Sequence, residues 1–151
     1  MQATEALAQR LAPRLAPGFV LYLSGELGTG KTSFVRALLR ALGFAGRVKS
    51  PSFSLLESYD LSSFRLYHFD FYRFDSEQDW LDAGFEEYIG APHVAVVEWP
   101  ERAIGTLPTP DLHLFLRFDE DGGDGRIVEA VAHTARGRAC LNALAPDDAR
   151  C

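Results

Sequence analysis

The sequence predicts an α/β domain in which a mixed central sheet is flanked by helices and ends in a C-terminal antiparallel hairpin. Two apolar runs, 19–23 and 93–99, have the length and composition of strands buried on both faces. A segment with helical periodicity, 32–43, follows the first run, and a cleanly alternating segment, 111–118, lies near the C-terminus. This mixture of helices with buried and alternating strands is typical of an α/β sheet with an antiparallel part.

Length and composition predict a single domain over residues 1–151, with a frayed tail at about 146–151. A hydrophobic share of 47% and a charged share of 24% are those of an ordinary globular protein. No apolar run is long enough to cross a bilayer and the first residues lack a secretory signal, so we expect a cytoplasmic protein without membrane contact. Cys140 and Cys151 lack C-x-x-C spacing, which argues against a disulfide framework or a zinc site and favours inert free thiols.

The formal net charge is −6, and it argues against a protein that binds nucleic acid by itself. Affinity for phosphate backbones comes mostly from Lys and Arg. Here arginine supplies nearly all of the positive charge, since Lys31 and Lys49 are the only lysines, and the sequence contains no basic run.

The N-terminal helices follow from periodicity and from cap residues. Thr4 can cap a short helix that carries Leu7 and Leu11 on one face and ends near Pro13. After a glycine-rich loop, a second helix carries an apolar stripe and stops at Gly43. The stripe consists of Phe34, Val35, Leu38, Leu39 and Leu42.

The middle of the chain is expected to be extended. Pro51 disfavours helix at the residue before it, so 50–60 is interpreted as extended. The aromatic-rich segment 64–74 has the composition of a strand, and its period of two places three polar residues on one face. These residues are His68, Asp70 and Tyr72.

The C-terminal elements have clear boundaries. Ser76 can start a short helix that ends at Gly84. The strand 111–118, the turn-rich DEDGGDGR and a second strand over 127–132 predict a β-hairpin. A final helix is expected over 138–144.

Residues 25–32, GELGTGKT, match G-x-x-x-x-G-K-[ST] at every defined position. Glycines let the backbone curl so that several N–H groups point at one anion, at the positive end of the following helix. Lys31 would reach the β- and γ-phosphates, and the Thr32 hydroxyl would ligate magnesium. A strand precedes the loop and a helix follows it, so we favour a nucleotide site over a flexible turn; the spacing does not support a Rossmann site. The expected ligands are Gly28, Thr29, Gly30, Lys31, Thr32 and Ser33.

Glu98 is the first candidate for the acid that an NTPase needs near its metal. It ends the apolar strand 93–99, where it could hold magnesium or polarise the attacking water. The alternative is a surface acid beyond a strand end. Trp99, by itself, is better explained by packing than by catalysis.

His68 and Asp70 are the second pair of candidate residues for a role near the metal. A strand face that carries both is unusual for a core, because each needs a polar partner when buried. A role near the metal or in orienting water is plausible, and a hydrogen-bonded structural cluster remains an equal alternative. His68 has no second histidine at ligand spacing, so we do not expect a metal held by the protein alone.

Ser52 and Ser54 lie in the segment SPSFS, which Pro51 stiffens. Their hydroxyls could sense the γ-phosphate, as switch loops do. An ordinary surface loop explains them equally well.

Four segments in this order, GELGTGKTSFVRALLRALG, VKSPSFSLLESY, LYHFDFYR and VVEWPE, resemble the TsaE family of bacterial P-loop ATPases, which act in tRNA threonylcarbamoyladenosine biosynthesis. The resemblance runs from about Thr4 into the last hairpin. It implies a compact P-loop NTPase-like domain that binds ATP and Mg²⁺. It also implies partners of the TsaD and TsaB type, which modify the tRNA and contact it for the most part, while ATP hydrolysis resets their complex between turnovers.

Carried over by resemblance, Lys31 and Thr32 match phosphate and magnesium ligands. Asp70 and Glu98 match the essential acids, with Glu98 at the magnesium and Trp99 alongside, and Thr4 matches a threonine near the adenine. The usual family loop is S-P-T-F-T, so SPSFS keeps both hydroxyls and loses two methyl groups.

Two other functions remain open. A small-molecule kinase shares the loop but needs a lid and an acceptor pocket, and no Arg-rich lid insertion is visible. A nucleotide-gated assembly module would bind nucleotide with negligible hydrolysis. Guanine recognition by N-K-x-D is excluded because Asn142 is the only asparagine.

Overall fold

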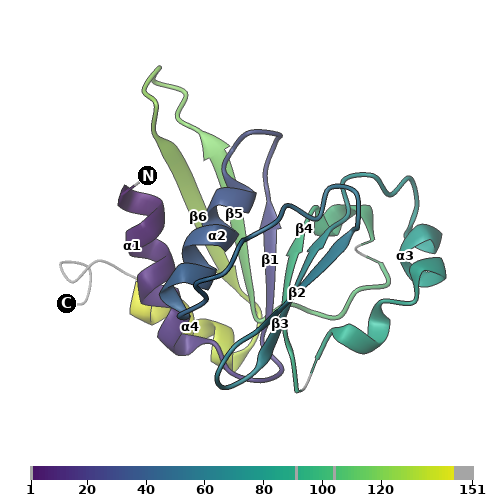
Figure 1. Ribbon diagram of the computed structural model, residues 1–151. Helices are drawn as coiled ribbons and strands as arrows, with labels where there is room; N and C mark the ends of the chain where they lie inside the picture. The colour runs from purple at the N-terminus through teal and green to yellow at the C-terminus, as the bar shows by residue number, and fades with distance from the viewer. Residues whose placement is uncertain (1, 91, 104, 145–151) are drawn as a thin grey trace.

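The computed structural model describes residues 2–90, 92–103 and 105–144. Its strands are β1 (Val20–Ser24), β2 (Leu56–Asp60), β3 (Arg65–Asp70), β4 (Val94–Glu98), β5 (Leu112–Phe118) and β6 (Arg126–Ala132) (Figure 1). They form one sheet in the order β2-β3-β4-β1-β5-β6. The four inner strands are parallel, and β2 and β6 pair antiparallel at the two edges. The predicted mixed sheet and C-terminal hairpin are confirmed.

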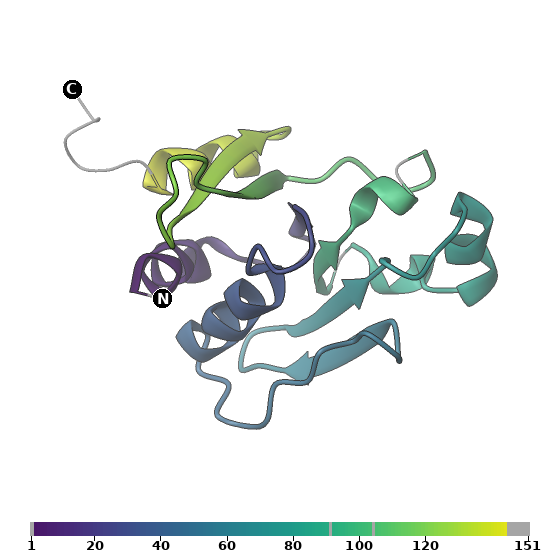
Figure 2. The same ribbon diagram turned by 90° about the horizontal axis from the view of Figure 1, so that it is seen from above.

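The helices divide between the two faces of this sheet. Three helices share one apolar cluster with one face: α1 (Gln2–Leu11), α2 (Lys31–Ala41) and α4 (Ala135–Leu144). The short α3 (Glu77–Ala83) packs on the other face. Figure 2 shows α3 on the far side of β3 and β4 from the adjacent pair α1 and α2. None of the described helices is long and apolar enough to cross a membrane.

The central strands β1 and β4 are buried along their whole length, as their apolar runs predict. Successive side chains of a strand point to opposite faces, so a strand between two layers needs apolar residues at every position. Leu21 and Leu23 accordingly join the cluster under α1 and α2. Val20 and Tyr22 join the cluster under α3. The carboxyl ends of β1 and β4 are thereby held at one edge of the sheet.

Thr4 does not cap the first helix. α1 begins at Gln2, so Thr4 lies in its first turn rather than at its boundary. Gln and Ala are good helix formers and extend the helix before the threonine. The helix ends at Leu11, and Pro13 follows in a 3-10 turn over Ala12–Arg14, as its missing N–H requires.

The expectation of an extended chain over 50–60 is correct only for its second half. The Leu55 N–H donates to the Pro51 carbonyl at 2.8 Å, which closes a turn, and Leu55 has a positive φ of 66°. Strand β2 starts at the next residue, Leu56. Pro51 disfavours helix only at the residue before it, so it allows a turn of this kind in the residues that follow.

The expectation that Tyr72 shares a strand face with His68 and Asp70 is wrong. β3 ends at Asp70, whose carboxylate accepts the Tyr72 N–H at 3.0 Å. A side chain that binds the backbone two residues on initiates a turn and competes with a continued strand. Tyr72 is therefore exposed beyond the strand end.

The helices of the C-terminal half have local signals. Ser76 and Asp79 form a capping box for α3, and Gly84 ends this helix in the left-handed conformation, as predicted. α4 begins at Ala135 rather than at 138, because the Thr134 hydroxyl accepts the Gly137 N–H and extends the helix start. Cys140 is a buried free thiol. Cys151 and the predicted tail 146–151 lie outside the described residues.

Candidate functional site

The glycine loop joins β1 to α2 and is tightly folded against β5. A Cβ atom on Gly25 would lie 2.3 Å from the Leu116 carbonyl oxygen and 2.7 Å from the Thr29 hydroxyl. Any side chain there would push the loop away from the sheet, so glycine is required at this position. Thr29 is fully buried, and its hydroxyl donates to the Glu26 carbonyl at 2.8 Å. The Thr29 side chain thus braces the loop. That Thr29 is among the ligands stays a prediction.

The end of this loop presents a helix N-terminus to a cavity. Gly30 has a φ of 102° and directly precedes α2, so it has no side chain with which to cap the first N–H groups of the helix. These N–H groups have no partner within the helix and carry its positive dipole end. An anion in front of them would be bound by both effects.

A cavity of about 380 Å³ lies in front of α2 and collects most of the predicted site. It is lined by the end of the glycine loop, by two strand-end acids and by two flanking segments. Its lining residues are Leu27, Gly28, Gly30, Lys31, Thr32, Ser33, Ser50, Ser52, Asp70, Tyr72, Arg73, Glu98 and Trp99. Ser54 is not among them; its hydroxyl donates to Glu57 at 3.1 Å.

The two acids meet because their strands are parallel neighbours. In the register of β3 and β4, Asp70 lies beside Glu98, at the carboxyl ends of both strands. β4 in turn pairs with β1, which leads into the glycine loop. The Thr32 hydroxyl lies 3.1 Å from each carboxylate oxygen of Glu98. The alternative of a surface acid is wrong for Glu98, whose exposure is 2%.

His68 lies behind Glu98, and together they make a buried polar pair. The His68 Nε2 atom is 2.6 Å from Glu98 Oε2, and the imidazole is fully buried. The other ring nitrogen, Nδ1, is buried and has no hydrogen-bond partner among the described residues. Sequence periodicity predicted the shared face of His68 and Asp70, but it could not assign this contact to Glu98.

Lys31 is folded back onto its own loop. Its ammonium donates to the carbonyls of Gly25 at 2.5 Å and Glu26 at 2.9 Å, and it lies 4.5 Å from the centroid of the Trp99 ring. Burial lowers the pKa of Lys31, while nearby carboxylates, Glu98 first among them, oppose that shift. An ammonium held over an aromatic face is stabilised by the ring quadrupole.

Trp99 has a position that its sequence context did not predict. It follows β4 directly and has a φ of 58° in the left-handed region, which is strained for an aromatic residue. Pro100 follows in a 3-10 turn, and this turn aims the indole back at Lys31. The side chain therefore lines the cavity, and it also packs against the apolar cluster under α3, as expected from Trp99 alone.

The surroundings of Asp70 change the pKa of its carboxyl group. Burial raises the pKa of Asp70, and the negative charge of Glu98 adds to that shift. The hydrogen bond from the Tyr72 N–H acts in the opposite direction. A carboxylate with a raised pKa is a better proton acceptor than an ordinary aspartate.

Sequence reasoning missed the contacts that anchor the loop after Trp99. The Ser24 hydroxyl donates to Glu101 at 2.8 Å and lies 2.7 Å from the His113 Nε2 atom. Burial lowers the pKa of His113 to about 4. These contacts tie β1 and β5 to the turn that carries Trp99, and no local sequence signal joins three such distant residues.

The donor set fits a magnesium ion that is bound together with a nucleotide. Over the described ranges, no three His, Cys, Asp or Glu side chains converge to hold a metal by themselves. Thr32 and Glu98 supply hard oxygen donors at one point of the cavity. Mg²⁺ commonly takes one or two protein oxygens and completes its shell with phosphate oxygens and water.

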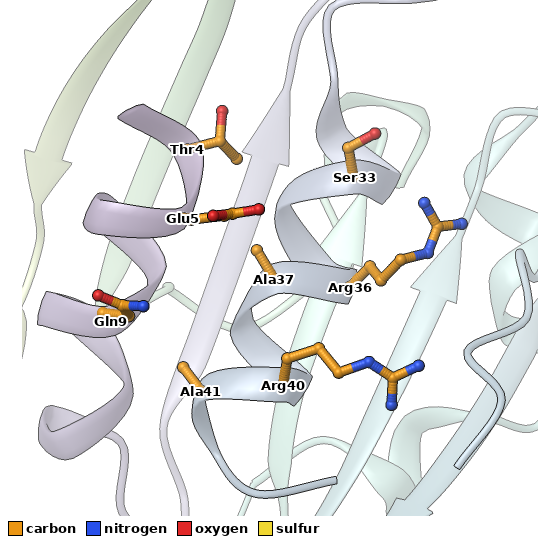
Figure 3. A pocket seen from close by; sticks show the side chains of 8 residues that line it. All are labelled: Thr4, Glu5, Gln9, Ser33, Arg36, Ala37, Arg40 and Ala41. Atoms are coloured by element: carbon orange, nitrogen blue, oxygen red, sulfur yellow. The ribbon is translucent and has the colours of Figure 1, made fainter. Parts of the chain in front are cut away.

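Thr4 lies beside this cavity rather than in it. A second cavity, of about 360 Å³, runs between α1 and α2 (Figure 3). Thr4, Glu5 and Gln9 line it from α1, and Ser33 lines both cavities from the start of α2. The prediction that Thr4 contacts the adenine stays a prediction.

Comparison with known proteins gives a consistent result. The family model described as threonylcarbamoyl adenosine biosynthesis protein TsaE matches residues 1–128. A TsaE protein from Haemophilus influenzae is 33% identical over 125 residues, which are 83% of this chain and 77% of that protein. One from Bacillus subtilis is 35% identical over 131 residues, 87% of this chain and 80% of that protein. The crystal structure of Bacillus subtilis YdiB superposes with a TM-score of 0.78 at 30% identity and covers 95% of this chain and 87% of that one.

Proposed function

This chain belongs to the TsaE family, and from that premise we propose that it is a Mg²⁺-dependent ATPase of tRNA threonylcarbamoyladenosine biosynthesis. In this proposal it binds and hydrolyses ATP, slowly when alone, and so drives the turnover of a TsaB- and TsaD-type complex in the cytoplasm. One observation supports ATP binding and hydrolysis above all others. Lys31 and Thr32 face Asp70 and Glu98 in a single cavity at a helix N-terminus.

The glycine loop supports the phosphate-binding step. Backbone N–H groups at the start of α2 would bind the phosphates, as they do in P-loop NTPases. Lys31 now donates to the carbonyls of Gly25 and Glu26. Nucleotide binding would draw its ammonium from these carbonyls to the phosphates, a stronger, charged acceptor.

Thr32 and Glu98 are the proposed magnesium ligands. Bound Mg²⁺ would neutralise charge that develops on the phosphate oxygens. Both residues are already aligned, with the Thr32 hydroxyl 3.1 Å from the carboxylate oxygens. This contact favours Glu98 over Asp70 as the acid at the metal.

Asp70 is the proposed acid for the attacking water. Its carboxylate lines the same cavity, and its raised pKa suits it to orient water and to accept a proton. The water oxygen would bond to the γ-phosphorus as the bond to the ADP oxygen breaks, and the proton of the water would pass to Asp70.

The names of the relatives support the biological part of the proposal, since both cited proteins are tRNA threonylcarbamoyladenosine biosynthesis proteins. The net charge of −6 favours tRNA contact mainly through the partners.

A reconstituted modification assay tests this function. With TsaB- and TsaD-type partners, tRNA and the threonylcarbamoyl donor, we expect product to stop near one turnover per active site unless this protein and ATP are added. Repeated turnover without this protein would contradict the proposal. Nucleotide-dependent assembly without ATP consumption would replace it with a nucleotide-gated module.

A further inference from the structure

The buried pair of His68 and Glu98 has an arrangement that stability alone does not explain. The imidazole is fully buried, and the Glu98 side chain is 3% exposed. His68 Nδ1 lacks a hydrogen-bond partner within the described part of the chain, so the ring has one polar contact, the carboxylate of Glu98. A structural histidine in a polar network normally satisfies both nitrogens, because a buried unpaired polar atom is costly. This single polar contact indicates that the role of His68 is to act on the Glu98 carboxylate.

The direction of this hydrogen bond follows from the chemistry of its partners. A carboxylate that ligates magnesium must be ionised, and an ionised carboxylate only accepts hydrogen bonds. In the proposed role of Glu98 the hydrogen between the two side chains therefore resides on His68 Nε2, which lies 2.6 Å from Glu98 Oε2. The Thr32 hydroxyl approaches both carboxylate oxygens from the side of the cavity.

Three elements fix the geometry of this contact. His68 is paired with Val96 in the register of β3 and β4, two positions before the pair of Asp70 and Glu98. His68 and Glu98 therefore share the sheet face that α2 covers, and Thr32 lies in the first turn of α2. The imidazole stands behind the carboxylate and Thr32 stands in front of it, so the carboxylate is held between them.

We propose that His68 is a positioning residue, whose Nε2–H holds the Glu98 carboxylate facing Thr32 so that the two oxygen donors meet Mg²⁺·ATP together. A glutamate has three rotatable side-chain bonds, and freezing them in advance lowers the entropy lost when the metal binds. Partners behind a metal ligand typically change metal affinity or activity by about 10–100-fold. The inference rests on the proposed ATPase function.

Two substitutions separate positioning from bulk structure. In His68→Gln the side-chain amide can place its N–H near the position of Nε2, whereas in His68→Asn the amide is too short and reaches only the position of Nδ1. We expect His68→Asn to raise the Mg²⁺ concentration for half-maximal ATP binding by roughly 10–100-fold and to lower kcat with little change in ATP affinity without Mg²⁺. His68→Gln should recover most of both losses. His93→Asn, at a partly buried ring that packs on Tyr67, is the matched control and should change neither.

Wild-type Mg²⁺ dependence and kcat in His68→Asn would overturn the inference. Equal losses in His68→Asn and His68→Gln, with ATP binding weakened equally with and without Mg²⁺ and a lower melting temperature, would also overturn it, since they indicate a structural histidine. If the wild-type protein itself neither binds nor hydrolyses ATP with its partners, the proposed function fails instead.

A measurement on the unsubstituted protein does not depend on the folding of any variant. Long-range ¹H–¹⁵N spectra of the imidazole should show the hydrogen of His68 on Nε2, and the Nε2 resonance should move when Mg²⁺·ADP is added but not with ADP alone. A hydrogen on Nδ1 only, or an Nε2 resonance indifferent to Mg²⁺, would contradict the inference.

Discussion

The Thr32 hydroxyl and the Glu98 carboxylate lie 66 positions apart in the chain and meet at 3.1 Å. One belongs to the first turn of α2 and the other to the end of β4. Their contact joins the two halves of the proposed site, the phosphate-binding loop and the strand-end acids.

Lys31→Ala should abolish ATP binding for practical purposes. The ammonium is the positive charge that the loop would supply to the phosphates on nucleotide binding, and we expect a loss of roughly 100-fold in affinity. Titration calorimetry with ATP and Mg²⁺ measures it. Lys49→Ala removes the other lysine, which lines neither cavity, and should bind as the wild type does. Unchanged affinity in Lys31→Ala would show that the nucleotide binds elsewhere.

Glu98→Ala should spare ATP binding in the absence of Mg²⁺ and remove hydrolysis. Its carboxylate is the proposed acid at the metal, and its loss should lower kcat on the order of 100-fold or more. Single-turnover hydrolysis in the presence of the partners is the relevant measurement. If the variant hydrolysed ATP at the wild-type rate, the role assigned to Glu98 would be wrong.

Asp70→Asn should lower hydrolysis without unfolding the domain. Because burial raises the pKa of Asp70, the protonated form favours folding: this contribution is complete below the ordinary carboxyl pKa and is lost as pH rises through the raised value. At neutral pH the amide should therefore match or slightly exceed the stability of the wild type, and the two melting temperatures should converge in acid. A large drop in melting temperature at neutral pH would favour the structural cluster that the sequence left open.

Trp99 fluorescence should report nucleotide binding. Its ring lies 4.5 Å from the Lys31 ammonium, which the phosphates would draw away. The other tryptophan, Trp80, belongs to α3, is buried against the sheet and should not respond. We expect the ATP-dependent change in emission to vanish in Trp99→Phe and to persist in Trp80→Phe. Persistence in Trp99→Phe would contradict the proposed movement of Lys31.

Gly25→Ala should destabilise the loop and weaken nucleotide binding. The added Cβ would lie 2.3 Å from the Leu116 carbonyl oxygen, a backbone atom that cannot move alone, and overpacking of this kind costs about 1–3 kcal/mol. Gly123→Ala is the control, because its Cβ would come no closer than 3.8 Å to any neighbour. Denaturant unfolding measures the stability of both variants. Equal stabilities would contradict the requirement for glycine at position 25.

The sequence predicted the phosphate loop and the two acids because their signals are local. The pattern GELGTGKT lies between a buried strand and an amphipathic helix, and Glu98 ends an apolar run. The parallel register that brings Asp70 beside Glu98 depends on strand order, which periodicity does not contain.

The remaining contacts depended on backbone turns and on distant packing. The Asx-type turn at Asp70 moved Tyr72 off the strand face, and the left-handed φ of Trp99 aimed its ring at Lys31. The contact of His68 with Glu98 joins adjacent strands across 30 positions, so the sequence could show only that His68 needed some partner.

The decisive measurement for a partner-stimulated ATPase is ATP hydrolysis by the purified protein, alone and then with TsaB- and TsaD-type partners from the same source. We expect slow hydrolysis by the isolated protein, clear stimulation by the partners, and loss of both rates in Lys31→Ala. Hydrolysis that is indifferent to the partners would contradict the proposed role and direct the search to a phosphate acceptor, as in a small-molecule kinase.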